Sequence, residues 1–85
     1  MNWEIRWTER ALRDAEKLDR RVKERILDSL DRLAETGQGN VRHLTDEGGE
    51  LRLRVGDWRV RFIYRQETRT IDVLRVLHRR DVYRR

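Results

Sequence analysis

Four arginines that alternate with apolar residues are the side chains of this sequence best placed to bind an anion. They lie within residues 51–65, as Arg52, Arg54, Arg59 and Arg61. Strict alternation is typical of half-buried strands, and the Gly-Asp pair between the two alternating segments is a signal for a type II′ hairpin turn. A two-residue loop would place Arg54 opposite Arg59, and Arg52 opposite Arg61, on one face of the hairpin.

This arginine face is expected to bind a polyanion. Like charges directly opposite one another destabilise a sheet, so a bound anion would relieve the repulsion between the two pairs. The guanidinium group also presents a planar fork that matches phosphate geometry. An alternative explanation is an edge that charge protects against aggregation, but lysine or mixed charge would serve that purpose with less repulsion.

A second polar cluster, His78, Arg79, Arg80 and Tyr83, follows the apolar run 70–77. Arginine keeps its proton near neutral pH, so proton transfer would require another kind of side chain. Guanidinium groups beside a tyrosine favour its phenolate and lower its pKa, which makes Tyr83 a candidate general base, although a C-terminal tyrosine is more often a packing residue. The other candidates for proton transfer are His78, His43, Tyr64 and Glu50.

The net charge of +5 lies entirely in the second half of the chain. Residues 1–36 carry nine basic and nine acidic side chains, whereas residues 37–85 carry twelve arginines, no lysine and seven acidic side chains. A basic excess concentrated on one part of a small protein favours a nucleic-acid partner.

Several kinds of site are not expected. The chain has no cysteine, and its two histidines show no ligand spacing, so the sequence predicts neither a disulfide nor a metal site. No glycine-rich loop is followed by lysine and a helix, so no nucleotide cofactor is expected. There is no signal-peptide pattern and no apolar stretch of about 20 residues. We therefore expect a cytoplasmic protein with no membrane partner.

Hydrophobic spacing predicts the elements that would position these residues. Residues 2–7 alternate as a strand does. Two helices are predicted over residues 9–18 and 20–35, with Thr8 and Asp19 as N-caps and Gly37 after the second. Their expected core-facing residues are Ala11, Leu12, Ala15 and Leu18 in the first helix, and Val22, Ile26, Leu30, Leu33 and Ala34 in the second.

The remaining elements complete an α+β pattern. Residues 37–49 are expected to form a glycine-rich connector that Val41 and Leu44 anchor to the core. The apolar run 70–77 is typical of a central strand covered on both faces. The order β-α-α-β-β-β then predicts a helical hairpin packed on a small antiparallel sheet, in a single domain of residues 1–85.

Two stretches of the sequence carry a family resemblance. They are Leu51-Arg-Leu-Arg-Val-Gly-Asp-Trp-Arg-Val-Arg-Phe-Ile-Tyr64 and Val73-Leu-Arg-Val-Leu-His-Arg-Arg-Asp-Val-Tyr83. They resemble the RelE/ParE superfamily of toxins of type II toxin–antitoxin systems, and the RelE-like branch in particular. The pattern of that superfamily is roughly L-R-x-G-[DY]-[YW]-R-[VIL]-x-[YF], followed by V-x-x-H-R-[RK]-[ED]-[VI]-Y.

The resemblance implies a microbial-RNase-like fold and a toxin that inhibits translation. RelE-like members enter the ribosomal A site and cleave mRNA there without metal, with the 2′-hydroxyl as nucleophile. The catalytic residues implied by position are Arg59, Arg79, Tyr83 and His78. The residues expected to bind phosphate or RNA are Arg52, Arg54, Arg61 and Arg80. A cognate antitoxin that covers the basic face is also implied.

Two other functions fit the same motifs. A ParE-like member would inhibit DNA gyrase by binding, without nuclease chemistry. A non-toxic module of the same fold would bind nucleic acid, with an affinity that falls as salt rises, and would consume no substrate.

Overall fold

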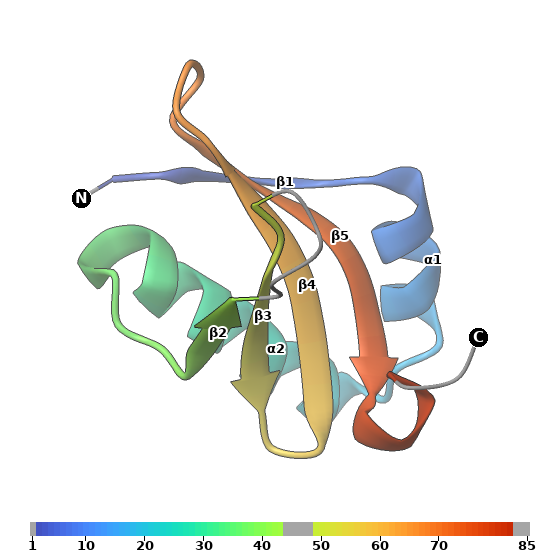
Figure 1. Ribbon diagram of the computed structural model, residues 1–85. Helices are drawn as coiled ribbons and strands as arrows, with labels where there is room; N and C mark the ends of the chain where they lie inside the picture. Colours follow the sequence, from blue (N-terminus) through green and yellow to red (C-terminus); the bar gives the residue numbers. More distant parts are fainter. Residues whose placement is uncertain (1, 44–48, 83–85) are drawn as a thin grey trace.

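The computed structural model describes residues 2–43 and 49–82, which form two α-helices, five strands and one short 3-10 helix (Figure 1). In chain order, the elements are β1 (Glu4–Trp7), α1 (Glu9–Glu16), α2 (Arg20–Thr36), β2 (Val41–His43), β3 (Leu51–Val55), β4 (Trp58–Arg65), β5 (Thr70–His78) and the 3-10 helix η1 (Arg79–Asp81). None of the described helices is both long and apolar enough to cross a lipid bilayer.

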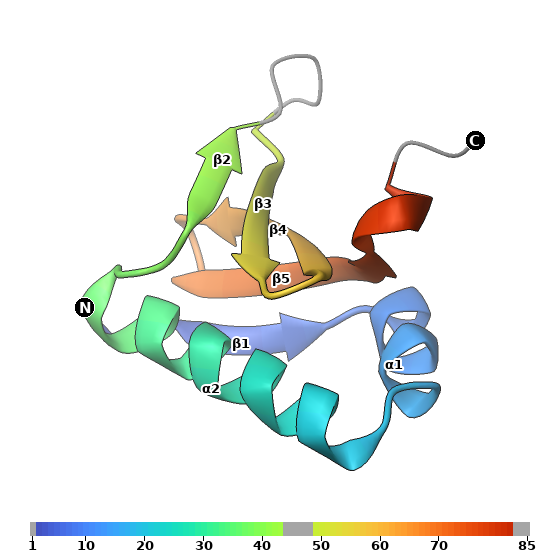
Figure 2. The same cartoon turned by 90° about the horizontal axis from the view of Figure 1, so that it is seen from below.

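The strands form one sheet in the order β1-β5-β4-β3-β2, with α2 lying along one face (Figure 2). The predicted α+β class, with two helices on a small sheet, is confirmed. The sheet is mixed, however, where an antiparallel one was expected, because β1 pairs with β5 in parallel. Both helices and three strands separate these two partners in the chain, so no tight turn forces them to run in opposite directions.

The connector over residues 37–49 contains a strand that the sequence pattern did not predict. β2 pairs antiparallel with β3 and forms one edge of the sheet. Val41 packs against the core as expected, whereas Leu44 lies outside the described residues. A three-residue strand is too short to show a clear alternation, which explains why the pattern suggested only a loop.

Both predicted helix N-caps are confirmed. The Thr8 hydroxyl accepts a hydrogen bond from the backbone N–H of Ala11 at 3.1 Å, and the Asp19 carboxylate accepts one from that of Val22 at 2.9 Å. Gly37 ends α2 in the left-handed conformation, with φ of 77°, which glycine adopts without steric cost.

The core lies between α2 and the sheet. Its buried residues include Ile26, Leu30 and Leu33 from α2, and Leu53, Val60, Phe62, Ile71 and Val73 from the sheet. α1 contributes Ala11, which is fully buried. Leu12, expected on the same inner face, is instead 50% exposed. Leu12 directly follows Ala11, and successive residues of an α-helix point about 100° apart, so Leu12 is turned away from the core.

A bulge explains the nearly continuous apolar run of β5. Phe62 pairs with Val73 whereas Arg61 pairs with Arg75, so Leu74 is an extra residue in β5. The bulge shifts the alternation, and Val73 and Val76 are therefore both buried although they are three residues apart. β5 is an interior strand, but β4 rather than β5 occupies the middle of the sheet.

Candidate functional site

The hairpin of β3 and β4 has the register that the sequence predicted. Arg54 pairs with Arg59, and Arg52 pairs with Arg61. Gly56 opens the turn with φ of 60°, a conformation that favours glycine and is typical of the first turn residue in a type II′ hairpin. All four arginines therefore belong to the sheet face opposite to the core.

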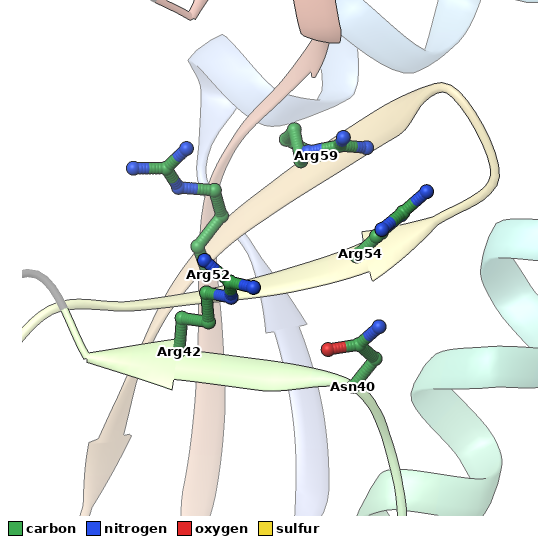
Figure 3. Close-up of a pocket in the computed structure, with 5 residues that line it drawn as sticks. All are labelled: Asn40, Arg42, Arg52, Arg54 and Arg59. Carbon is green, nitrogen blue, oxygen red and sulfur yellow. The ribbon is translucent and has the colours of Figure 1, made fainter.

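Three of the four hairpin arginines, with one arginine from β2, line a shallow pocket on this face (Figure 3). The described residues that line it are Asn40, Arg42, Arg52, Arg54 and Arg59, and its volume is about 140 Å³. No acidic side chain is among them. Because guanidinium groups only donate hydrogen bonds and keep their charge near neutral pH, the arrangement suits a phosphate group. We call these five residues the arginine pocket.

Residues at the start of β2 complete the pocket and were missed in the sequence. Arg42 lies opposite Arg52, and the carbonyl oxygen of Asn40 accepts a hydrogen bond from the backbone N–H of Arg54 at 2.9 Å. The alternation of Val41, which packs against the core, with Arg42 was the available signal. An alternation over only three residues was too short to distinguish a strand from a loop.

The pairing registers place four arginines in one row across four neighbouring strands. Arg42 pairs with Arg52, Arg52 with Arg61, and Arg61 with Arg75. Neighbouring strands lie about 4.8 Å apart, so the row spans roughly 14 Å. Without the bulge in β5, this row would not extend to Arg75.

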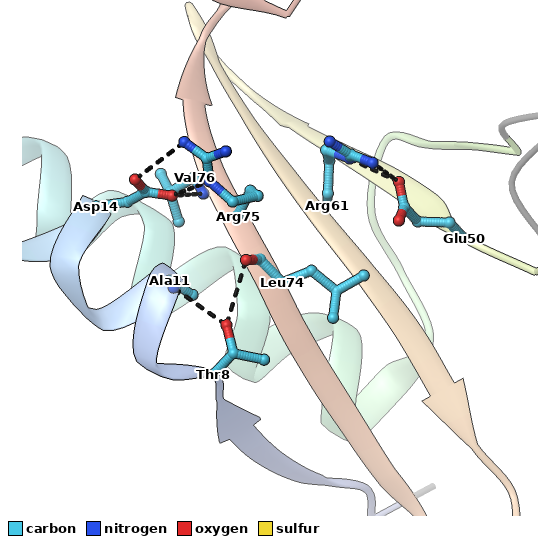
Figure 4. Close-up of polar contacts among 8 residues, drawn as sticks. All are labelled: Thr8, Ala11, Asp14, Glu50, Arg61, Leu74, Arg75 and Val76. Atoms are coloured by element: carbon cyan, nitrogen blue, oxygen red, sulfur yellow. Dashed lines mark hydrogen bonds and ion pairs between the residues drawn. The ribbon is translucent and has the colours of Figure 1, made fainter.

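Carboxylates hold the β4 and β5 members of this row (Figure 4). The Nε of Arg61 donates to Glu50 at 2.6 Å. Arg75 donates to both carboxylate oxygens of Asp14, at 2.8 and 3.3 Å, and Asp14 also accepts the backbone N–H of Val76 at 2.9 Å. Arg61 is thus bound to Glu50 and does not line the arginine pocket. Its expected role in phosphate binding stays a prediction.

The guanidinium group of Arg59 is held by the hairpin turn that precedes it. Its Nη1 donates to the carbonyl oxygens of Gly56 at 2.9 Å and Trp58 at 3.0 Å. These contacts orient a long side chain that would otherwise sample many rotamers. The turn therefore preorganises one wall of the arginine pocket.

The C-terminal residues reach the same turn from β5. His78 pairs with Trp58, and the backbone N–H of Arg79 donates to the carbonyl oxygen of Asp57 at 2.7 Å. The structure thus brings His78 and η1, which contains Arg79 and Arg80, close to the hairpin, but none of the three lines the pocket. Tyr83 lies outside the described residues, so its role as general base stays a prediction.

The other candidates for proton transfer lie elsewhere. Tyr64 packs on the rings of Trp3 and Phe62, with centroids 5.0 and 5.4 Å apart. Burial raises the pKa of the Tyr64 phenol, so even less of it is present near neutral pH as the phenolate that could accept a proton. His43 is exposed on β2, and Glu50 is bound to Arg61. No histidine, tyrosine or carboxylate lines the pocket in the part of the chain that the structure describes.

Comparison with known structures shows where this fold occurs. The structure resembles a chain of the archaeal RelE–RelB complex of Pyrococcus horikoshii (TM-score 0.77, 21% identity, covering 93% of this chain and 97% of that one). It also resembles a chain of the RelBE2 toxin–antitoxin complex of Mycobacterium tuberculosis (TM-score 0.77, 26% identity, 93% and 100% covered). For the intact RelBE complex of E. coli, the TM-score is 0.72, with 22% identity over 87% and 93% of the two chains.

The sequence comparison agrees with the fold. No curated protein matches the chain in sequence. The family model for the ParE toxin of type II toxin–antitoxin systems matches residues 5–83, which is nearly the whole chain and includes the hairpin and the C-terminal motif. The chain therefore belongs to the ParE toxin family of type II toxin–antitoxin systems, within the RelE/ParE superfamily whose fold it shares.

Proposed function

We propose that this toxin is a metal-independent endoribonuclease that cleaves mRNA in the A site of the ribosome. The observation that carries the proposal is the arginine pocket, which four arginines from three strands line without a carboxylate among the described lining residues. The proposal also draws on the RelE-like sequence pattern. A ribosomal target would place the protein in the cytoplasm.

The proposed reaction transfers a phosphoryl group within the RNA. The 2′-oxygen of one nucleotide attacks the adjacent phosphorus, and the bond from phosphorus to the 5′-oxygen breaks. The departing 5′-oxygen takes up a proton from solvent, so a 2′,3′-cyclic phosphate and a 5′-hydroxyl result. Negative charge develops on the phosphate oxygens, which fixed positive donors stabilise. Arg52, Arg54 and Arg59 would supply these donors. Tyr83 would accept the proton of the 2′-hydroxyl, with Arg79 favouring its phenolate.

An antitoxin is the second proposed partner. The similar structures from P. horikoshii, M. tuberculosis and E. coli are toxin–antitoxin complexes. For this chain we propose a cognate antitoxin whose acidic side chains would cover the arginine pocket, since a pocket that suits phosphate also suits carboxylates. Bound antitoxin would then prevent RNA from reaching the arginine pocket.

The decisive experiment is cleavage of mRNA on programmed ribosomes, mapped by primer extension. Arg59→Ala should slow cleavage by about 100-fold or more, since removing one donor to the developing charge typically costs that much. Arg20→Ala is the matched control, because it removes the same charge from an exposed position on α2 and should cleave at the wild-type rate. Intact mRNA after incubation with wild-type protein and ribosomes would contradict the proposal.

A gyrase inhibitor is the alternative, and one observation favours it: the matching family model is that of the ParE toxins. In that case the arginine face would bind its target without chemistry. A DNA supercoiling assay separates the two functions. Inhibition of gyrase by wild-type protein, with mRNA left intact on ribosomes, would select this alternative.

A further inference from the structure

His78 occupies the junction between β5 and η1, and its ring has a specific hydrogen-bonding role there. His78 precedes η1 with φ of −71° and ψ of 147°, and its Nδ1 accepts the backbone N–H of Arg80 at 3.3 Å. This is N-cap geometry, in which a side-chain acceptor satisfies a backbone donor of the first helical turn. A nitrogen that accepts a hydrogen bond carries no proton, so the neutral ring has its proton on Nε2.

Two further contacts tie this junction to the hairpin turn. The ring of His78 meets the ring of Trp58 edge-on, with centroids 5.2 Å apart and an interplanar angle of 84°. The backbone N–H of Arg79 donates to the carbonyl oxygen of Asp57 at 2.7 Å. The same turn holds the guanidinium of Arg59 through the Gly56 and Trp58 carbonyls. One turn therefore orients both a wall of the arginine pocket and the start of the C-terminal segment.

The hydrogen bonding of His78 conflicts with the acid–base role that the sequence suggested for it. To accept a proton at Nδ1, the ring would have to release the N–H of Arg80. His78 also does not line the arginine pocket. We propose that His78 is a positioning residue, whose Nδ1 caps η1 and so holds Arg79 and Arg80 beside the hairpin turn. This inference rests on the proposed nuclease function for its effect on cleavage.

Two substitutions separate capping from ring chemistry. In His78→Asn, the side-chain oxygen takes a position similar to that of Nδ1, and asparagine is among the best N-cap residues. In His78→Gln, the amide reaches one carbon further, to the region of Nε2. Neither variant can act as an imidazole. Capping therefore predicts that asparagine rescues and glutamine does not, whereas acid–base chemistry predicts that both fail.

The first measurement is hydrogen exchange of the Arg80 amide in the ¹⁵N-labelled protein. Relative to wild type, exchange should stay within about twofold in His78→Asn and become about fivefold faster in His78→Gln, which corresponds to the loss of a typical cap. His43→Gln is the matched control, since His43 is exposed on β2 and its substitution should leave Arg80 exchange unchanged. Equal Arg80 exchange in wild type and both His78 variants would overturn the proposal.

The second measurement is the rate of mRNA cleavage on ribosomes. We expect His78→Asn to keep most of the wild-type rate. His78→Gln should cleave more slowly, by a factor similar to the increase in its Arg80 exchange. Loss of cleavage in His78→Asn, with Arg80 exchange still slow, would show that the ring takes part in the chemistry and would overturn the proposal. If the wild-type protein does not cleave mRNA, the nuclease function fails, and Arg80 exchange alone decides whether His78 is a cap.

Discussion

The Nε of Arg61 lies 2.6 Å from a carboxylate oxygen of Glu50, and this ion pair separates Arg61 from the arginine pocket. Glu50 is only 8% exposed, so Arg61 takes the place of water as a hydrogen-bond partner of its carboxylate. We expect Glu50→Gln to lower the free energy of unfolding by about 2 kcal/mol, since hydrogen bonds between charged groups are typically worth that much. The measurement is urea unfolding followed by circular dichroism.

The same substitution should change anion binding in the opposite direction. Without the carboxylate, the guanidinium of Arg61 can turn towards a phosphate, so the affinity for single-stranded RNA should rise.

Glu24→Gln is the control for the stability measurement. It disrupts an exposed i,i+4 pair with Arg20 and should lower the free energy of unfolding by less than about 0.5 kcal/mol. Equal stability losses in the two variants would show that Glu50 is not held as described.

The position of Arg42 in the pocket predicts a change in the salt dependence of binding. If Arg42 neutralises one phosphate, Arg42→Ala should lower the slope of log affinity against log salt concentration by about 0.7, the value for single-stranded nucleic acid. Affinity should fall by a similar factor for all RNA sequences, because phosphate contacts do not read bases. Fluorescence anisotropy with a short labelled RNA measures both quantities. Arg32→Ala on α2 is the control. A slope that changes as much in this variant as in Arg42→Ala would exclude a local contact between Arg42 and phosphate.

Gly56 should tolerate substitution poorly because of its backbone conformation. Its φ is 60°, and a Cβ there would lie 2.9 Å from an Nη atom of Arg25. That atom ends a flexible side chain and can move. We therefore expect Gly56→Ala to lower the free energy of unfolding by about 1–2 kcal/mol, mostly through backbone strain. Gly56→Asn should cost less, since asparagine accepts positive φ more readily. Thermal unfolding of both variants tests this order, and an alanine variant as stable as wild type would contradict it.

The partly buried phenol of Tyr64 predicts a loss of stability in alkaline solution. Burial raises the pKa of Tyr64 above its usual 10.0, so the folded state favours the neutral phenol. Its contribution is complete below pH 10 and is lost as pH rises through the folded pKa, because only the unfolded chain ionises readily there. Tyr64→Phe should flatten this part of the stability curve between about pH 9 and 11. Parallel curves for the two proteins would contradict the assignment.

Much of the fold follows from short-range patterns. The alternation of residues 51–65 and the Gly-Asp pair were enough to place Arg54 opposite Arg59 and Arg52 opposite Arg61, because a two-residue loop admits one register. The caps at Thr8 and Asp19 were equally predictable, since each bond joins residues three apart. The motifs within residues 51–83 also indicated the superfamily that the family comparison confirms.

The tertiary structure decided which arginines form the pocket. That selection depends on pairs distant in the chain: Arg42 lies beside Arg52, and Arg61 is bound to Glu50 instead of lining the pocket. A local pattern states which face of a strand a residue occupies, but not which strand lies beside it or which carboxylate it meets. Those partners are set when the whole sheet packs, and so the sequence determined the arginine face while only the packed sheet determined its pocket.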